Sequence, residues 1–504
     1  MKRLLPRPLA LVYAMVFLLA SALGAAGPLQ AQDSPWSSPV ELTTPLSQWD
    51  WFPDITADAR GDVHLIWQTA QCSATYKKPC LMYWRQRDGI WQPPYDVFLD
   101  QGAGQSAIRA AIATDRVGRL HLVYLKDFQY IVYQQAWISH ASSARTWSEP
   151  RRLGGFGHAY FPDIAVGPDG TLHAVWTESA GNKASPDCPL GDCADIFYRQ
   201  STDGGVRWSS PVNLSRSEVG TMKVHVLADA QGRVHVFWEE GGDRWVSDHP
   251  VGVAYALSAD GGQTWSAPQV FTHTGGFPRQ MMLGVDGQGQ IVAIWRLVPG
   301  DGIYYQVSSD GRQWSAPRRI PGIWPVESTA VFDDYDVAAD SQGHLHFVVS
   351  GRNSPTGQQA IFRIEWDGSG WLTPEQVSPY EGYPEFPRIA VGLGNTLHVA
   401  WFSKQWPGYE EGQVVRAWYS ARAIPAPART PAPMPTPTET PPPSTRTPFP
   451  TPTPFPTVPP DAVRPFNPAT LYTEGDEVTG LLLALLPVAV LIGLVAVISR
   501  ARRQ

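Results

Sequence analysis

The stretch PDIAVGPDGTLHAVW, residues 162–176, is the most informative part of the sequence because it recurs along most of the chain. Apolar and polar residues alternate in each half of it, and a glycine-containing turn separates the halves. This pattern predicts two antiparallel β-strands joined by a tight turn. Two copies of the stretch precede it and four come after it, at intervals of roughly 50–60 residues. They begin at Pro53, Ala110, Val224, Met281, Tyr335 and Pro387.

A second motif, Trp-x-x-Pro, alternates with the first and predicts a further strand. A short aromatic strand, such as 196–201, lies between the two motifs. Each unit therefore contains four strands, A to D in chain order, and repeated units of four short strands are typical of β-propeller blades. The tryptophans of the second motif are Trp36, Trp91, Trp147, Trp208, Trp265, Trp314 and Trp371.

The ends of the repeat series predict how the ring closes. The series opens with a single D strand at 36–42, and its last unit, ending at 415–424, lacks a D strand. Pairing of the first strand beside 417–423 completes a seventh blade and removes the exposed sheet edges. The sequence therefore predicts an all-β, seven-bladed β-propeller over residues 32–424, closed by its N-terminal strand.

Two further residue types recur with the blades. Tryptophans that end strand B predict a core between blades, and they are Trp67, Trp176, Trp238, Trp295 and Trp401. Histidines that begin strand B occupy equivalent places far apart around the ring, so they do not suit a metal site. We expect each of them to form hydrogen bonds within its own blade, and they are His64, His121, His173, His235, His346 and His398.

Composition excludes several classes of protein. The 504 residues include 48 prolines, 45 glycines and 21 tryptophans, which argues against a mainly helical enzyme and against wholesale disorder. The net charge is −7, although basic residues cluster at both ends of the chain. A body this acidic would repel phosphates, so we expect no nucleic-acid partner.

The ends of the sequence predict a membrane-anchored, extracellular protein. Residues 1–31 have the basic start, apolar run and small residues of a signal peptide, with an uncleaved anchor as the alternative. Residues 425–478 are rich in Pro and Thr and predict a disordered stalk, either glycosylated or a plain spacer. Residues 479–499 predict one transmembrane helix, and the basic residues at 500–504 predict a cytoplasmic tail at the plasma membrane.

The four cysteines form two local pairs in the sequence. Cys72 lies near Cys80, and Cys188 lies near Cys193. In an oxidising compartment, two disulfides in loops that follow strand B are expected. A four-thiolate zinc site is the alternative, but the spacing fits it poorly. We expect no metal and no cofactor, since the aspartates at 333–336 lack the spacing of a calcium loop.

The C–D hairpins carry the residues that link the chain to a known family. Ser258-Ala259-Asp260-Gly261-Gly262-Gln263-Thr264-Trp265 matches the Asp-box pattern S-x-D-x-G-x-T-W, and the hairpins before Trp208 and Trp314 are close variants. The chain thus resembles the BNR/Asp-box proteins of the sialidase-like β-propeller superfamily. The resemblance implies that the Asp binds backbone N–H groups of the turn, that the Trp packs beneath it, and that a functional site lies on the opposite face.

The start of strand A is the place where a ligand site is expected, because these strands line the channel. The predicted ligand-binding residues combine strand-A positions with two tryptophans in loops of that face, and they are Asp54, Asp163, His225, Arg279, Asp336, Arg388, Trp51 and Trp324. Exposed aromatic rings suit stacking on sugars. The alternatives are a water-filled channel with solvated charges and tryptophans that anchor their loops over the blades.

The family resemblance also implies a set of catalytic residues. A sialidase would use Arg109 (or Arg352), Arg279 and Arg388 to bind the substrate carboxylate, Asp54 as the acid, and Glu239 or Glu240 to activate Tyr383 or Tyr409. Three features depart from the family pattern. No arginine precedes Asp54 on the first strand, the tripeptide Arg319-Ile320-Pro321 lies in a D strand, and the family enzymes have six blades.

These departures favour recognition over catalysis. The leading hypothesis is a membrane-anchored propeller that binds an extracellular glycan or protein at the cell surface. An exo-α-sialidase or another glycoside hydrolase that acts in the funnel is the alternative, and a purely structural or adhesion module is the third. Convergence of three arginines in the funnel would favour the enzyme.

Overall fold

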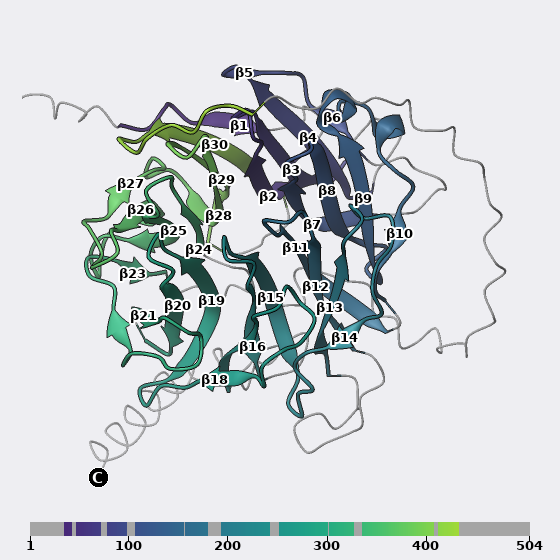
Figure 1. The fold of residues 1–504 in the computed structure, drawn as a ribbon. Coiled ribbons are helices and arrows are strands. Elements are labelled where there is room, and N and C mark those ends of the chain that lie inside the picture. Colours follow the sequence, from purple (N-terminus) through teal and green to yellow (C-terminus); the bar gives the residue numbers. More distant parts are fainter. Residues whose placement is uncertain are drawn as a thin grey trace, which may run out of the picture. The chain divides into compact units, whose positions relative to one another are not determined.

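The computed structural model describes residues 35–42, 47–71, 78–97, 106–155, 157–179, 193–241, 251–300, 302–326, 335–407 and 412–432. The chain divides into two units, Met1–Ser37 and Ser38–Gln504. In the second unit, the described strands form seven antiparallel sheets arranged in a ring (Figure 1). The seven-bladed β-propeller predicted from the repeats is therefore confirmed.

The first three blades follow one another along the chain. Blade 1 contains β2 (Asp50–Ala57), β3 (Val63–Thr69), β4 (Cys80–Arg87), β5 (Ile90–Trp91) and β6 (Tyr95–Asp96). Blade 2 contains β7 (Ala107–Thr114), β8 (Arg119–Lys126), β9 (Tyr130–Trp137) and β10 (Arg151–Arg152), with the 3-10 helices η1 (Ile138–His140) and η2 (Ala144–Thr146) between its last two strands. Blade 3 contains β11 (His158–Val166), β12 (Leu172–Ser179), β13 (Asp195–Ser201) and β14 (Val212–Asn213).

The remaining blades complete the ring. Blade 4 contains β15 (Thr221–Ala228), β16 (Val234–Glu240), β17 (Gly252–Ser258) and β18 (Gln269–Phe271). Blade 5 contains β19 (Phe277–Val285), β20 (Ile291–Val298), β21 (Ile303–Ser308) and β22 (Arg318–Arg319). Blade 6 contains β23 (Trp324–Pro325), β24 (Tyr335–Ala339), β25 (Leu345–Arg352), β26 (Ala360–Trp366) and β27 (Glu375–Gln376). Blade 7 contains β28 (Tyr383–Gly392), β29 (Thr396–Lys404), β30 (Val415–Ala423) and β1 (Val40–Leu42).

Blade 7 closes the ring with strands from both ends of the repeat series. β1 pairs antiparallel with β30, so that Val40 lies opposite Tyr419 and Leu42 opposite Ala417. This is the pairing expected from the missing D strand. We call the face that carries the A–B and C–D turns the turn face, and the face where strands A begin and strands B end the pocket face.

The Asp boxes build the turn face with the hydrogen bonds that the family resemblance implies. Oδ1 of Asp260 accepts from the backbone N–H of Thr264 at 2.9 Å and of Gln263 at 3.1 Å, while Oγ of Ser258 accepts from the N–H of Gly262 at 2.7 Å. A Cβ at Gly262 would lie only 1.8 Å from the Tyr198 hydroxyl of the preceding blade. Glycine is therefore required there by a close approach as well as by its φ of +90°.

The histidines of strand B are structural, as expected. In five blades Nδ1 of the histidine lies 2.7–2.8 Å from a tyrosine hydroxyl of strand C, and the pairs are His64 with Tyr83, His121 with Tyr133, His173 with Tyr198, His235 with Tyr255, and His398 with Tyr419. Several also reach the Asp of the A–B turn, as His235 does at 3.1 Å from Asp229. Burial lowers the pKa of His173 and of His398 to about 4, so these rings are neutral at pH 7.

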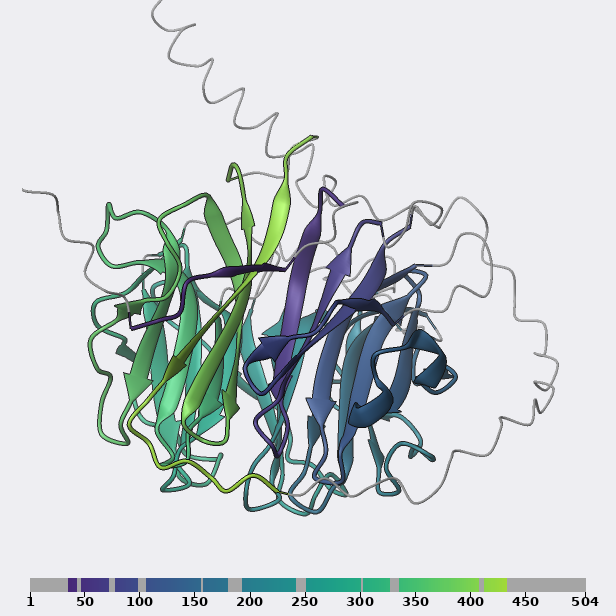
Figure 2. The ribbon, with the colours of Figure 1, turned by 90° about the horizontal axis from the view of Figure 1, so that it is seen from above.

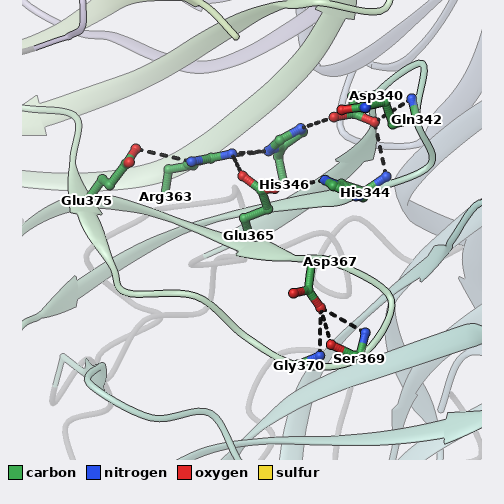
Figure 3. A network of polar contacts seen from close by, with 10 residues as sticks. All are labelled: Asp340, Gln342, His344, His346, Arg363, Glu365, Asp367, Ser369, Gly370 and Glu375. Carbon is green, nitrogen blue, oxygen red and sulfur yellow. Dashed lines mark hydrogen bonds and ion pairs between the residues drawn. The ribbon is translucent and has the colours of Figure 1, made fainter. Parts of the chain in front are cut away.

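Blade 6 keeps the histidine but replaces the tyrosine with Arg363 (Figure 3). Nε2 of His346 lies 3.2 Å from Asp340, and its Nδ1 accepts from Arg363 at 2.6 Å. The guanidinium of Arg363 also donates to Glu375 at 3.1 Å and to Glu365. Two carboxylates therefore balance the charge that the arginine brings into the blade.

Aromatic pairs join neighbouring blades. The strand-C tyrosine of one blade contacts the Trp-x-x-Pro tryptophan of the next, as Tyr198 contacts Trp265 with ring centroids 4.8 Å apart. Tyr419 and Trp91 make the same contact across the seam of the ring, also at 4.8 Å. The tryptophans that end strand B are buried throughout. The prediction that periodic tryptophans form the core between blades is confirmed.

The chain does not leave the propeller at residue 424, where the sequence placed the boundary. Residues 425–432, which we call the strap, run along the turn face after β30 (Figure 2). Arg429 N donates to Leu393 O at 2.7 Å, Ala432 N donates to Ala59 O at 2.9 Å, and Ser341 Oγ donates to Pro427 O at 2.5 Å. The strap therefore contacts the A–B turns of blades 6, 7 and 1, and a stalk begins no earlier than residue 433.

Several sequence predictions lie outside the described residues. These are the signal peptide at 1–31, the stalk from 433, the transmembrane helix at 479–499 and the tail at 500–504. Within the described part of the chain, no helix is long and apolar enough to span a membrane. Neither Cys80 nor Cys193 is a free thiol, but Cys72 and Cys188 are not described, so their pairing stays a prediction.

Candidate functional site

A β-bulge recurs in the A strand of every blade that the structure describes through this region, which is all except blade 6. The pairing of strands A and B shifts there, as it does between Trp51 and Asp54 in blade 1. One residue of each bulge has a φ of 48–55°, a left-handed conformation that is uncommon without glycine. These bulge residues are Phe52, Arg109, Phe161, Lys223, Gln280 and Phe386.

The bulges direct side chains to a pocket at the start of the A strands. Five of the six bulge residues line it, together with strand-A residues from blades 1 to 4 and blade 7. Its volume open to water-sized molecules is about 60 Å³. That space suits one small charged group better than a whole large ligand, since complete ligand sites usually measure roughly 300–1,000 Å³. The lining is Phe52, Asp54, Arg109, Ala110, Ala111, Phe161, Pro162, Asp163, Lys223, Val224, His225, Phe386 and Arg388.

Two arginines of the pocket are held by aromatic rings. The guanidinium of Arg109 lies 3.8 Å from the ring centroid of Phe52 and 5.4 Å from that of Phe161. The guanidinium of Arg388 lies 3.7 Å from the ring of Phe386, and Phe386 contacts Phe52 edge to face. Nη1 of Arg388 also donates to Pro387 O at 3.0 Å. Stacking fixes the plane of a guanidinium, and a guanidinium held in one plane suits binding of a carboxylate or sulfate.

Three aspartates occupy the same strand-A position and join neighbouring blades. Oδ2 of Asp54 accepts from Ile112 N at 2.7 Å, that of Asp163 from Val226 N at 3.0 Å, and that of Asp336 from Ile389 N at 2.9 Å. Each acceptor therefore satisfies a backbone N–H of the following blade. Asp54 and Asp163 line the pocket, whereas Asp336 is not among its lining residues.

The pKa of Asp54 is raised to about 7. Burial is the main cause, and the negative charges of Asp163 and Asp336 add to it, while Arg388 and the hydrogen bond from Ile112 oppose it. Burial likewise raises the pKa of Asp336, against the attraction of Arg388. The pocket therefore holds a carboxyl group that changes its charge near neutral pH.

The third predicted arginine is occupied elsewhere. Arg279 lies 3.2 Å from Glu239, which also lies 3.2 Å from Lys223 and accepts from Gln280 N at 2.9 Å. Although burial opposes ionisation, Arg279 and Lys223 lower the pKa of Glu239 to about 2. Arg279 and Glu239 do not line the pocket. The three-arginine cluster expected of a sialidase is therefore not assembled among the described residues, because only Arg109 and Arg388 meet there.

The other proposed catalytic residues also lie apart from the pocket. Tyr383 begins β28 opposite Lys404, and Arg352 donates to Pro325 O at 3.0 Å. Glu240 binds Ser217 and Trp238, at 2.5 and 2.7 Å. None of these three side chains lines the pocket. Tyr409 lies outside the described residues, as do Asp333, Asp334 and Trp245.

The expected tryptophan platforms are not confirmed. Trp51 is 7% exposed, stacks on Phe52 and meets Trp49 edge to face, so it anchors its strand rather than presenting a ring to solvent. Trp324 belongs to the short strand β23 instead of a loop, and its ring lies 5.3 Å from the guanidinium of Arg319. Neither tryptophan lines the pocket.

Sequence reasoning missed the aromatic wall of the pocket. Phe52, Phe161 and Phe386 each stand two positions before a strand-A residue that was predicted to face the channel, as Lys223 does in blade 4. A strict two-residue alternation that runs backwards by one step from Asp54 and its equivalents places all four residues on that face.

No protein-family model matches the sequence, and no curated protein matches it. Similar solved structures include a protein of unknown function from Dyadobacter fermentans, with 16% identity over 77% of this chain and 98% of that chain, at a TM-score of 0.46. They also include the NanB sialidase of Streptococcus pneumoniae, with 14% identity over 78% and 71% and a TM-score of 0.44. A polysaccharide lyase described as an ulvan lyase has 15% identity over 62% and 79%, at a TM-score of 0.41. The assignment of this chain as a seven-bladed β-propeller rests on its own strand pairing.

Proposed function

We propose that the propeller is a recognition domain whose pocket binds an acidic group, a carboxylate or sulfate, of an extracellular glycan. The observation that carries this proposal is the pair of guanidiniums, Arg109 and Arg388, that stack on phenylalanine rings in one small pocket. Arginine binds planar or tetrahedral oxyanions through two parallel hydrogen bonds. The pocket admits the charged group, and the surrounding loops of the pocket face would contact the rest of the glycan.

The location of the strap supports a membrane-distal pocket. We propose that residues 1–31 are a signal peptide and that 479–499 anchor the protein in the plasma membrane, with the propeller outside the cell. The strap runs along the turn face, so a stalk that continues from residue 433 would leave the pocket face directed away from the membrane. Carbonate extraction of membranes, with and without residues 433–504, tests the anchor.

Binding of acidic sugars tests the recognition proposal. Glucuronic acid and N-acetylneuraminic acid are titrated calorimetrically into the full-length protein, with glucose as the uncharged control. We expect the acids to bind and glucose not to bind. Arg109→Ala or Arg388→Ala should weaken binding at least about tenfold, because each removes a charge-assisted contact worth roughly 1.5–3 kcal/mol.

The control variant for this test is Arg60→Ala. Arg60 is an exposed arginine in an A–B turn of the turn face, so its loss changes the net charge by the same amount without touching the pocket. The Arg60→Ala protein should bind the acids with wild-type affinity. Equal weakening by Arg60→Ala and Arg388→Ala would mean that only overall charge matters, and would refute a specific pocket.

Glycoside hydrolysis is the second candidate, and Asp54 is the observation that favours it. A carboxyl group with a pKa of about 7 in a pocket could donate a proton to a leaving oxygen at neutral pH. Against it, Glu239 is bound to Arg279 and Lys223 and is not placed to activate a tyrosine. Turnover of a fluorogenic α-sialoside or glucuronide that Asp54→Asn abolishes would establish the hydrolase, and its absence would leave binding as the function.

A further inference from the structure

The three aspartates at the start of the A strands are equivalent in position but not in their hydrogen bonds. Each uses Oδ2 to accept from the next blade. In Asp163 and Asp336, Oδ1 accepts from the N–H of the following residue, in both cases at 2.8 Å. Oδ1 of Asp54 accepts no hydrogen bond from any residue that the structure describes. Since Asp54 lines the pocket and is partly exposed there, this oxygen is the one of the three that can serve a ligand.

Charged groups from several other blades lie around Asp54. Arg388 of β28 and Arg109 of β7 are positive, and Lys223 and His225 of β15 stand across the pocket. The negative neighbours are Asp163 of β11 and Asp336 of β24. Lys404 of β29 and Arg416 of β30 belong to strands that also contact β2, but they pair with Glu385 and Glu41.

We propose that an acidic ligand enters this pocket together with one proton, which Asp54 holds on Oδ1. An anion between Arg109 and Arg388 adds a negative charge beside the Asp54 carboxylate, and the two repel each other. Protonation removes this repulsion and turns Oδ1 into a hydrogen-bond donor toward the ligand. The inference rests on the proposed function and adds a regulation to the same site, because affinity then depends on pH.

The sign of the pH dependence of ligand affinity follows from the coupling between proton uptake and ligand binding. Asp54 has a pKa of about 7 in the unoccupied pocket, so it is already protonated at pH 5.5 and must take up a proton at pH 8.5. Affinity should therefore be constant well below pH 7 and fall by up to about tenfold per pH unit above it. A compartment or surface of low pH would favour the bound state, and a rise in pH would release the ligand.

Calorimetric titration of glucuronic acid into the full-length protein at pH 5.5, 7.0 and 8.5 tests the proposal. The carboxylate of this probe is ionised throughout the range. We expect Kd to rise about thirtyfold between pH 5.5 and 8.5, with close to one proton taken up per ligand at pH 8.5. Buffers of different ionisation enthalpy give the proton count with the wild-type protein alone, so the test does not depend on the folding of a variant.

Two variants locate the proton. Asp54→Asn keeps an acceptor for Ile112 N but cannot titrate, so its Kd should vary less than about threefold over the same range. Asp163→Asn is the comparison at the same strand position, with both oxygens already bonded. It removes one of the charges that raise the pKa of Asp54, so the midpoint of the pH profile should move to lower pH while the uptake of one proton at pH 8.5 remains. An Asp54→Asn protein that keeps the thirtyfold change would overturn the assignment to Asp54.

The remaining outcomes separate this inference from the proposed function. Glucuronate bound with one Kd at all three pH values, without proton uptake, overturns the inference and leaves the recognition function standing. Absence of binding by either acidic sugar at every pH overturns the recognition function, and the inference with it.

Discussion

The turn face and the pocket face of this propeller are built from the same seven repeats in opposite ways. On the turn face the side chains repeat with the backbone, so that a histidine, a strand-C tyrosine and an A–B-turn aspartate recur in blade after blade. At the bulges of the pocket face only the backbone repeats. Six bulges share one left-handed conformation, yet they carry phenylalanine three times and arginine, lysine and glutamine once each.

This difference separates the structural from the functional part of the blade. A residue that must complete a buried hydrogen-bond network has little freedom, because an unsatisfied polar group in the core costs about 1–3 kcal/mol. A residue on a bulge at the channel has its backbone fixed and its side chain free to vary. The repeated bulge thus presents a different side chain from each blade to one shared pocket.

The largest expected effect on the free energy of unfolding comes from removal of a buried hydrogen-bonding side chain near the turn face. His235→Ala should destabilise the protein by about 2–4 kcal/mol, because it leaves a cavity and deprives both Asp229 and the Tyr255 hydroxyl of a buried partner. Urea unfolding followed by tryptophan fluorescence measures the change in free energy of unfolding.

The pocket-face counterpart of this variant is Arg109→Ala. It removes contacts between a cation and two aromatic rings, so we expect a loss of only about 1 kcal/mol in the same measurement. Similar losses for both variants would contradict the division between a structural and a functional face.

The sequence predicted the turn face better than the pocket face, and the reason is periodicity. Repetition of His64 and its equivalents identified them as structural, and their bonds to tyrosines confirm it. The Arg279–Glu239 pair joins residues 40 positions apart in neighbouring blades, so spacing within one repeat gave no sign of it. The sequence therefore places both residues in the candidate site, whereas in the structure neither lines the pocket.

Two further predictions, for Trp51 and for residues 425–432, differ from the structure because they used only local features of the sequence. Trp51 stood out because it breaks the tryptophan period, but its neighbours Phe52 and Phe386 bury it in an aromatic cluster. The sequence places the strap in the stalk because its proline-rich composition does not predict a strand. Its contacts are with turns far away in the chain, at Ala59 and Leu393, and composition alone does not predict such contacts.

Removal of the strap is a further test of the difference between the two faces, since the strap should stabilise only the turn face. Two shortened proteins, ending at residue 424 and at residue 432, differ only by the strap. The longer one should be more stable by at least about 1.5 kcal/mol, because three hydrogen bonds to blades 6, 7 and 1 each contribute roughly 0.5–1.5 kcal/mol. Urea unfolding of both proteins measures the difference.

Because the strap is hydrogen-bonded to blade 7, which β1 completes, and to blade 1, its loss should also favour opening of the ring between these two blades. Hydrogen exchange of β1 should therefore increase in the shorter protein, while exchange in β11 and β15, on the far side of the ring, should not change. Ser341→Ala in the longer protein, which removes one of the three bonds, should show a fraction of the same effect. Equal stability and equal exchange in the two shortened proteins would show that the strap lies on the turn face without stabilising the closed ring.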